Sequence, residues 1–326
     1  MQAVVMQAYG APAVLALAEH ADPVERPGWV VVRLQASALN WHDVLVRRGQ
    51  YASPLPHVPG ADGAGVRVDT GEDVVVLPSL FWGDRESAPG PRWEILGDHR
   101  PGTYAELVSV PAECVVPRPA GLGLVEAAAL PLVGLTTYRA LFSRGRLQGG
   151  ESVLVLGASG GVATMAVSLA AAAGAHVVVT SSSPDKIASA QSLGASSGVD
   201  HAAPDWVTQA RAATAGGEGF DVVLDSVGRW DESVRCLRPG GRCVVLGASA
   251  ATEVTMDVRP YFFGQYELIG TTMGSPADMA GLLEFVAAYD VPPPVVDRTF
   301  GLDEAAAAHE RLEAGTGFGK IVLLHN

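Results

Sequence analysis

The stretch from Ser152 to Lys186 reads SVLVLGASGGVATMAVSLAAAAGAHVVVTSSSPDK and decides the fold. It places an apolar strand before a glycine turn, followed by a helix of small residues and a second apolar strand. This order is typical of a dinucleotide-binding βαβ unit, in which the turn lets the backbone approach a pyrophosphate and the helix N–H groups face its charge. The turn itself is degenerate, with Ala158, Gly160 and Ala163 at the fingerprint positions, so an ordinary strand-to-helix turn is the alternative. The second strand, about thirty residues on, favours the dinucleotide site.

Composition narrows the classes of protein to consider. A chain of 326 residues predicts about two domains, and 48% hydrophobic residues against 17% charged ones predict substantial cores. The formal net charge is −13, and the isoelectric point is about 5.0. Binding to nucleic acid or to an anionic membrane needs clustered lysine and arginine, so neither is expected as the main partner.

The cysteines and the apolar stretches predict a cytoplasmic protein with no membrane contact. Cys114, Cys236 and Cys243 match no zinc or redox spacing, which favours inert thiols in a reducing compartment. The amino-terminal residues MQAVVMQAYG lack the basic start and long apolar run of a signal peptide. The stretch from Met165 to Thr180 is rich in alanine and too short for a membrane span, so it predicts a buried helix and strand.

The chain changes character about a third of the way along. The first part reads as short strands separated by glycine, proline and aspartate turns, with a long irregular loop at 79–102. The rest alternates helices with strands, which predicts an α/β fold with a doubly wound parallel sheet. The predicted domains are residues 1–122 with 272–326, and residues 123–271.

Several motifs together resemble the medium-chain dehydrogenase/reductase superfamily, most closely its zinc-free quinone oxidoreductase and enoyl reductase branch. They are Asn40-Trp-His-Asp43, Arg48-Gly-Gln-Tyr51, Pro59-Gly-Ala-Asp-Gly-Ala-Gly65, ALPLVGLTTYRAL, LGASGGVA, FDVVLDSVG, LRPGGRCVVLG, IGTTMGS and GKIVL. The resemblance spans nearly the whole chain. It implies a GroES-like β domain at residues 1–122 and 272–326, and a Rossmann dinucleotide-binding domain at residues 123–271.

The chain departs from the zinc alcohol dehydrogenases of that superfamily at the metal positions. Where those enzymes place Cys, His and Cys, this chain has Asn40, Ala61 and Leu132. Alanine and leucine have no lone pair to offer a zinc ion. The lobe that carries structural zinc in those relatives has no cysteine here between Leu80 and Gly102. We therefore expect no metal.

The cofactor is predicted from the end of the second strand of the βαβ unit. A Rossmann unit that binds NAD places an acidic residue there to bond the ribose 2′-OH, whereas this strand is followed by Ser181, Ser182 and Ser183. Hydroxyls and Lys186 suit the 2′-phosphate of NADPH, which a carboxylate would repel. Asp185 fits the first turn of a helix capped by Ser183, which explains its charge locally. We predict NADPH; alternatively, the serines and Lys186 only cap and flank that helix.

Further cofactor contacts are expected at the glycine turn and at the carboxyl ends of strands. The candidates are Ala158, Ser159, Gly160, Gly161 and Val162 in the turn, Asp225 and Gly247 after later strands, and, by resemblance, Thr136 beside the nicotinamide. For Asp225 and Gly247 the alternative is a purely structural part in a turn.

The resemblance also implies the catalytic residues, Asn40 and Tyr51, both facing the nicotinamide. The Asn40 amide would hold a substrate carbonyl, unless Asn40 is only a helix cap. The Tyr51 phenol would protonate or orient an enolate, unless it is a rim aromatic that packs against prolines. Asp43 and Arg48 are expected to form a structural ion pair, and His42 is expected to be structural or solvent-facing.

These observations predict an NADPH-dependent oxidoreductase that transfers hydride to a quinone or to an activated alkene of the α,β-unsaturated carbonyl type, without zinc. One alternative is an enoyl-thioester reductase of fatty-acid or polyketide metabolism. Another is a non-catalytic NADPH-binding structural or sensing protein. A small molecule is the expected substrate. An exposed sheet edge near residue 268, together with the resemblance, predicts a homodimer.

Overall fold

A computed structural model describes residues 1–325 of the chain, which divide into two compact units. The first unit comprises Met1–Val133, Gly274–Ala277 and the chain from Pro293 onward, and the second comprises Gly134–Met273 and Asp278–Pro292. The fold class is the predicted one, since a β-rich unit is joined to a parallel-sheet α/β unit. None of the helices in residues 1–325 is long and apolar enough to span a membrane.

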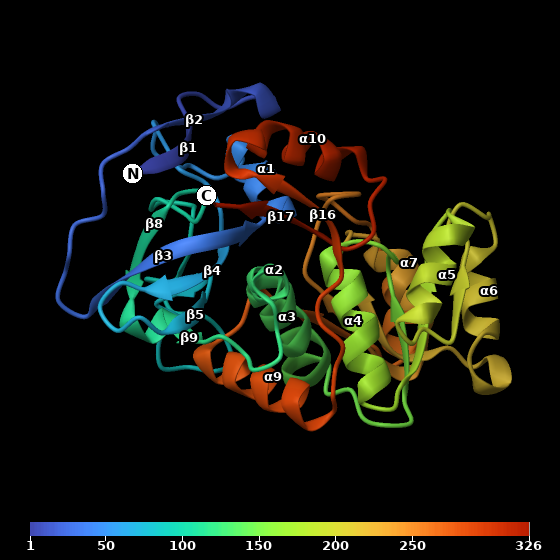
Figure 1. The fold of residues 1–326 in the computed structure, drawn as a ribbon. Coiled ribbons are helices and arrows are strands. Elements are labelled where there is room, and N and C mark those ends of the chain that lie inside the picture. Colours follow the sequence, from blue (N-terminus) through green and yellow to red (C-terminus); the bar gives the residue numbers. More distant parts are fainter. Residues whose placement is uncertain (326) are drawn as a thin grey trace. The chain divides into compact units, whose positions relative to one another are not determined.

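The first unit is built around an open, mostly antiparallel sheet with the order β16-β17-β3-β4-β5-β9, and β8 pairs with β3 (Figure 1). Its strands are β1 (Gln2–Met6), β2 (Leu15–Glu19), β3 (Trp29–Ala38), β4 (Asp62–Arg67), β5 (Asp73–Val76), β6 (Ser79–Leu80), β7 (Glu94–Ile95), β8 (Leu107–Pro111), β9 (Val115–Pro117), β16 (Val296–Gly301) and β17 (Lys320–Leu324). Its helices are α1 (Trp41–Arg47), α2 (Leu124–Ala129) and α10 (Ala305–Ala314). In β3 the alternating Val30, Val32 and Leu34 point into the core. In β17 the consecutive residues Ile321, Val322 and Leu323 are all buried.

The second unit is a parallel sheet with the order β12-β11-β10-β13-β14-β15. Its strands are β10 (Ser152–Val155), β11 (His176–Thr180), β12 (Ser197–Val199), β13 (Phe220–Asp225), β14 (Leu237–Val245) and β15 (Glu267–Gly270). The helices are α3 (Pro131–Tyr138), α4 (Gly161–Ala172), α5 (Pro184–Ser192), α6 (Trp206–Ala212), α7 (Trp230–Arg235), α8 (Val258–Phe263) and α9 (Pro276–Ala288). The central strands are buried on both faces, which explains their continuous runs of valine and leucine.

Helix α9 shows where the chain crosses between the units. The sequence boundaries place all of 272–326 with the first domain, whereas residues 278–292 pack with the second unit. A buried ion pair joins Arg139 and Asp278 at the start of this segment, with nitrogen and oxygen 2.6 Å apart. Around it, the Phe285 ring packs against the rings of Tyr138 and Phe142. Strands β16 and β17 belong to the sheet of the first unit.

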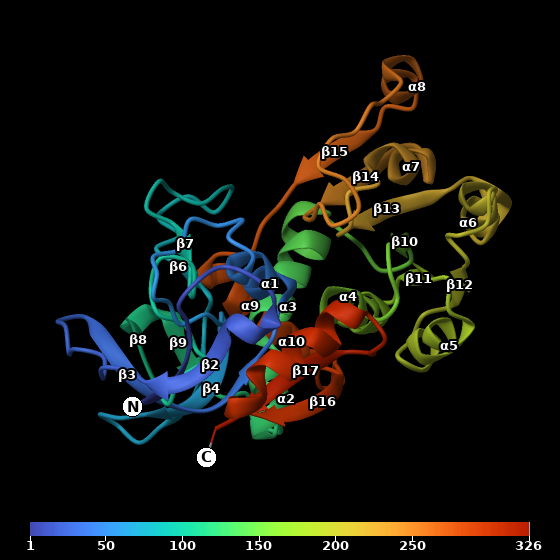
Figure 2. The ribbon, with the colours of Figure 1, turned by 90° about the horizontal axis from the view of Figure 1, so that it is seen from above.

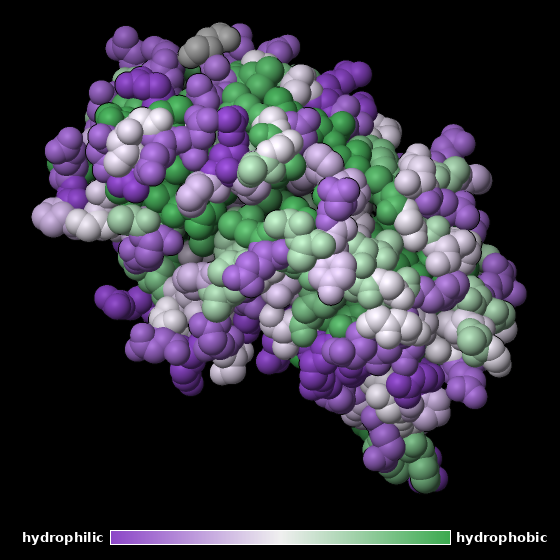
Figure 3. All heavy atoms as spheres, turned by 60° about the horizontal axis from the view of Figure 1, so that its bottom comes forward, coloured by the Kyte–Doolittle hydropathy of each residue, from purple (hydrophilic) through white to green (hydrophobic). Residues whose placement is uncertain are grey.

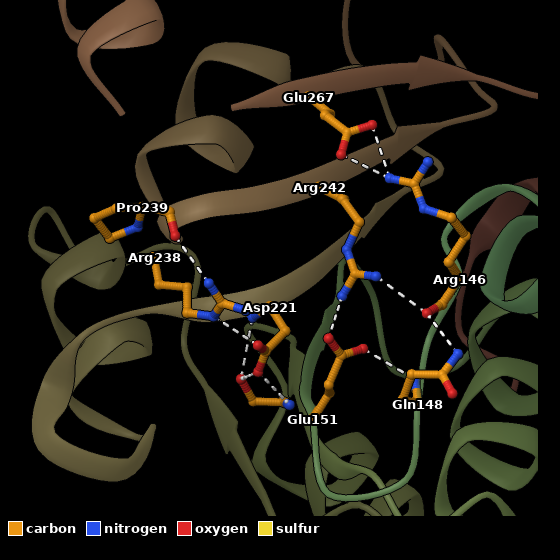
Figure 4. Close-up of polar contacts among 9 residues, drawn as sticks. Arg146, Gln148, Glu151, Asp221, Arg238, Pro239, Arg242 and Glu267 are labelled. Carbon is orange, nitrogen blue, oxygen red and sulfur yellow. Dashed lines mark hydrogen bonds and ion pairs between the residues drawn. The ribbon is translucent and has the colours of Figure 1, made fainter. Parts of the chain in front are cut away.

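A network of ion pairs ties the amino-terminal ends of the second unit's strands together (Figure 4). Arg242 donates to Glu151 at 2.5 Å, and Arg146 donates to both oxygens of Glu267 at 2.6 and 2.7 Å. Asp221 accepts from Arg238 and from the backbone N–H of Ser152. Ligands of open α/β sheets bind at the opposite, carboxyl ends of the strands, so this network is structural.

Candidate active site

Three strand ends of the first unit meet at one place and form a buried polar cluster. Strand β3 ends at Ala38, which pairs with Asp62, the first residue of β4. Strand β17 begins with Lys320, two residues before Val322, which also pairs with Ala38. This register places Asn40, just beyond β3, beside both side chains. We call Asn40, Asp62 and Lys320 the Asn–Asp–Lys cluster.

Every polar atom of this cluster has a partner. Lys320 Nζ donates to Asn40 Oδ1 at 2.5 Å and to Asp62 Oδ2 at 3.1 Å, while Asn40 Nδ2 donates to Asp62 Oδ2 at 2.9 Å. The other Asp62 oxygen accepts the backbone N–H of Leu132 at 2.7 Å, and Asn40 Nδ2 also reaches the Ala38 carbonyl at 3.3 Å. Only this orientation of the amide satisfies both a cation and a carboxylate. Asn40 therefore organises the cluster and does not present an unused donor.

The residues present do not fit a zinc ion. Of the three positions that the resemblance assigns to zinc ligands, Ala61 and Leu132 carry buried hydrocarbon side chains, and the Asn40 oxygen already accepts from an ammonium group. The Lys320 side chain is 4% exposed and lies beside the fully buried Asp62, so a cation of the protein itself occupies this cluster. Within residues 1–325, no group of three or more His, Cys, Asp or Glu side chains is arranged to hold a metal.

Asp43 belongs to a second buried chain of hydrogen bonds. Its Oδ2 accepts the Asn40 backbone N–H at 2.8 Å and the Tyr104 hydroxyl at 3.0 Å, and the Tyr104 oxygen lies 3.3 Å from His309 Nε2. Burial raises the pKa of Asp43 to about 6 and lowers the pKa of His309 to about 3. The predicted pair of Asp43 with Arg48 is wrong, because Arg48 reaches Glu313 instead. The aspartate caps α1 and helps to fix the Asn40 backbone.

Tyr51 lies near a histidine–aspartate pair that the sequence did not reveal. The Tyr51 ring packs edge-on against His42, with ring centroids 4.7 Å apart. His42 Nε2 in turn lies 2.5 Å from Asp98 Oδ1, on the loop after β7. Burial and the Asp98 charge raise the pKa of the Tyr51 phenol, which therefore stays neutral. The motif around Asn40 pointed to this region, but the partner of His42 lies 56 residues away in the sequence.

In the second unit, the glycine turn opens a helix as predicted. Gly157 has a φ of +97°, and its N–H donates to the Thr180 hydroxyl at 2.9 Å, which joins the turn to the end of β11. Gly160 precedes α4, whose first turn has no side-chain cap and no acidic residue. A Cβ added at Gly160 would meet nothing within 4 Å, so the space before this helix is open. The uncapped N–H groups suit a phosphate.

The serines after β11 divide into two kinds. Ser183 caps α5 and accepts the Lys186 backbone N–H at 3.4 Å, with Pro184 at the first helical position and Asp185 in the first turn. The buried Ser181 hydroxyl accepts the Ser183 N–H at 3.1 Å. Ser182 is exposed. The helix-cap interpretation of Asp185 is therefore confirmed, and Ser182 is the most exposed serine of this turn.

The other predicted cofactor residues have local structural partners. Asp225 is fully buried, and its carboxylate accepts N–H groups of Val227, Gly228 and Arg229 together with the Ser233 hydroxyl. It builds the turn after β13, the structural alternative left open by the sequence. At Gly247 an added Cβ would lie 2.1 Å from the Ser226 carbonyl oxygen, so close packing requires glycine there. The buried Thr136 hydroxyl contacts Met273 Sδ at 3.7 Å.

Comparison with known proteins agrees with this architecture. Residues 26–120 match the alcohol dehydrogenase GroES-like domain, and residues 161–288 match the zinc-binding dehydrogenase family. A quinone oxidoreductase of Pseudomonas aeruginosa is 34% identical, over 97% of each chain. A 2-methylene-furan-3-one reductase of Solanum lycopersicum is 33% identical, over 97% of this chain and 76% of its own length. A solved NAD-dependent alcohol dehydrogenase is 39% identical, covers 99% of each chain and has a TM-score of 0.93.

The fold is thus of the alcohol dehydrogenase type, with a GroES-like unit and a Rossmann-like parallel sheet. The chain belongs to the medium-chain dehydrogenase/reductase superfamily and is an oxidoreductase of that family.

Proposed function

We propose that this protein is an NADPH-dependent reductase that transfers hydride to a quinone or to an α,β-unsaturated carbonyl compound without zinc. The Asn–Asp–Lys cluster supports the proposal, because the Lys320 ammonium bonds Asn40, the residue that the resemblance puts at a zinc-ligand position, and the neighbouring Asp62. The names of two relatives, a quinone oxidoreductase and a 2-methylene-furan-3-one reductase, support the same acceptors.

The acceptor class follows from the charge that develops during reduction. Reduction of an isolated ketone concentrates negative charge on one oxygen, which a zinc ion would stabilise as a Lewis acid. In a quinone or an enone, that charge is spread over a conjugated system, so hydrogen-bond donors suffice. The neutral Tyr51 phenol is such a donor, and we propose it as the group that bonds the substrate oxygen. Asn40 is proposed as a positioning residue that holds this region through the Asn–Asp–Lys cluster.

The predicted cofactor fits the second unit. Bound NADPH would supply the hydride. The uncapped start of α4, at residues 158–162, would receive the pyrophosphate, while Ser182 and Lys186 would bind the 2′-phosphate. The solved relative at 39% identity is described as NAD-dependent, so the preference for NADPH depends on these local residues alone. The three buried free thiols suit the reducing cytoplasm predicted for this protein.

A substrate panel with metal analysis tests the proposal. We expect NADPH oxidation with 1,4-benzoquinone and with 2-methyl-2-cyclohexenone, no oxidation of ethanol with NADP⁺, and only traces of zinc in the purified protein. One zinc per chain, or alcohol oxidation that a chelator abolishes, would contradict it. Faster turnover of a crotonyl thioester would favour the enoyl-thioester alternative, and NADPH binding with no hydride transfer to any acceptor would favour the non-catalytic one.

We also propose that the protein is a homodimer. Strand β15 forms an edge of the second unit's sheet, and α8 lies beside it at that end (Figure 2). On the face drawn in Figure 3, patches of apolar residues reach the surface among polar ones. A single exposed apolar residue is therefore weak evidence for a dimer interface. In α8, however, Val258, Phe262 and Phe263 are 72%, 54% and 71% exposed, next to an unpaired strand edge. A second copy would cover both features.

Phe263→Glu should convert the dimer to a monomer in sedimentation velocity, because the substitution would bury a carboxylate in the interface. Val24→Glu is the matched control, since Val24 is a 73% exposed apolar residue of the first unit, and this variant should remain dimeric. A wild-type protein that sediments as a monomer refutes the dimer.

A further inference from the structure

The His42 imidazole is hydrogen-bonded to the buried Asp98 carboxylate. Its Nε2 donates to Asp98 Oδ1 at 2.5 Å, and the two side chains are 11% and 8% exposed. Within residues 1–325, the other ring nitrogen, Nδ1, makes no hydrogen bond, although it is not fully buried. An imidazole with one nitrogen anchored to a carboxylate and the other unpaired has the arrangement of a general acid or base.

This pair lies beside Tyr51, the residue proposed to bond the substrate oxygen, and close in sequence to the positioning residue Asn40. His42 lies in the first turn of α1, two residues after Asn40, and its ring packs edge-on against Tyr51. The charged groups that act on it are Asp98, on the loop after β7, and Asp43, on α1. Burial lowers the pKa of His57, which also interacts with Asp98. His57 is itself engaged, since its Nε2 lies 2.7 Å from the Gly97 carbonyl. The Asp98 carboxylate fixes the orientation of the His42 ring through its bond to Nε2.

We propose that His42, oriented by Asp98, is the general acid that completes the reduction of an activated alkene. This inference rests on the proposed reductase function. Hydride addition at the β-carbon moves the electron pair of the C=C bond toward the α-carbon and the carbonyl oxygen. The His42 imidazolium gives its Nδ1 proton to the α-carbon, so a C–H bond forms and an N–H bond breaks. Solvent then reprotonates the neutral imidazole, and the net reaction consumes NADPH, one proton and the alkene.

Tyr51 and His42 have complementary parts in this scheme. A phenol whose pKa is raised by burial and by Asp98 is a poor source of a transferred proton, but it remains a hydrogen-bond donor to the carbonyl oxygen. An imidazolium is the stronger acid. Because the environments of the two donors differ in this way, Tyr51 holds the carbonyl oxygen and His42 protonates the α-carbon.

The test compares two acceptors in the full-length protein. With 2-methyl-2-cyclohexenone, His42→Gln should lower kcat/KM by about 100-fold, the lower end of the usual range for general acid catalysis. With 1,4-benzoquinone the loss should be much smaller, because the product oxygens take protons directly from water. In D2O, wild-type enzyme should place deuterium on one face of the α-carbon, while His42→Gln should give a mixture of both faces. Asp98→Asn should show the same pattern, more weakly.

A second readout needs neither cofactor nor substrate. The ¹⁵N signals of His42 should identify Nε2 as the protonated nitrogen of the neutral ring in wild-type protein, and Asp98→Asn should weaken this tautomeric preference. His99→Gln is the matched control, because His99 is the exposed neighbour of Asp98, and it should behave as wild type in every assay.

The outcomes separate the two proposals. If His42→Gln keeps the wild-type rate and facial selectivity with the enone, or if it loses activity equally with both acceptors while keeping that selectivity, the assignment of His42 is wrong and the reductase function stands. If wild-type protein reduces neither acceptor with NADPH, the proposed function itself fails.

Discussion

Replacing Asp62 with asparagine is expected to lower the free energy of unfolding by about 3–5 kcal/mol, because it leaves the buried Lys320 ammonium without its carboxylate. The change is nearly isosteric, so lost charge and not lost volume causes the effect. Asp62 is completely buried and Lys320 is 4% exposed, which leaves water little access to the stranded cation. Urea unfolding followed by tryptophan fluorescence measures this, since Trp29, Trp41, Trp82 and Trp93 report on the first unit.

Two controls show whether the buried charge is responsible. Asp69→Asn removes the carboxylate of the exposed Arg67–Asp69 pair, and it should change the unfolding free energy by less than about 0.5 kcal/mol. The double variant Asp62→Asn with Lys320→Met should recover part of the loss, because no unpaired charge remains. An Asp62→Asn protein as stable as the Asp69→Asn protein would show that the Asn–Asp–Lys cluster contributes nothing to stability.

Ser182→Asp is expected to lower the preference for NADPH over NADH by about 100-fold in kcat/KM, the effect of about 2–3 kcal/mol. The new carboxylate would repel the 2′-phosphate and accept a hydrogen bond from the 2′-hydroxyl of NADH. Ser182 is the exposed serine of the turn, whereas Ser181 and Ser183 are engaged in local hydrogen bonds. Steady-state kinetics with both cofactors and a single acceptor measures the ratio.

Gln191→Glu is the matched control for this charge. Gln191 is exposed near the other end of α5, so the variant adds the same negative charge to the same helix away from the turn. It should leave the cofactor ratio within about two-fold of wild type, because solvent and salt screen exposed charges at that distance. If wild-type protein uses NADH as well as NADPH, the prediction of NADPH is wrong whatever the variant does.

The sequence predicted those features that depend on neighbouring residues. The βαβ unit follows from strands of valine and leucine around a glycine turn, and the cap of α5 follows from Ser183, Pro184 and Asp185 in succession. The stretch VEAAALPLVGLTTYRALF forms three successive helical segments, α2, α3 and a π-helical segment at Arg139–Arg144. Pro131 starts α3 where it cannot continue α2, since proline lacks the N–H that an interior helix position needs.

The candidate site was predicted less completely. Asn40 and Tyr51 came from a motif, yet the motif does not show that the Asn40 amide is already engaged by Asp62 and Lys320. The ion pair predicted between Asp43 and Arg48 rested on their closeness in the sequence. In the structure, Arg48 pairs with Glu313 instead. The buried Asp43 carboxylate accepts a hydrogen bond from Tyr104, which the tertiary packing places beside it.

By itself, the sequence determined that this protein carries a dinucleotide-binding α/β unit and a β-rich unit, for which local periodicity and residue type suffice. The resemblance to the family added the expectation that Asn40, Ala61 and Leu132 stand at its zinc-ligand positions. Only the tertiary structure showed which side chains surround Asn40 and His42. Lys320 reaches Asp62 and Asn40 across 258 and 280 residues, and His42 reaches Asp98 across 56. Sheet register and loop packing make these contacts, and neither leaves a periodic signal in the chain.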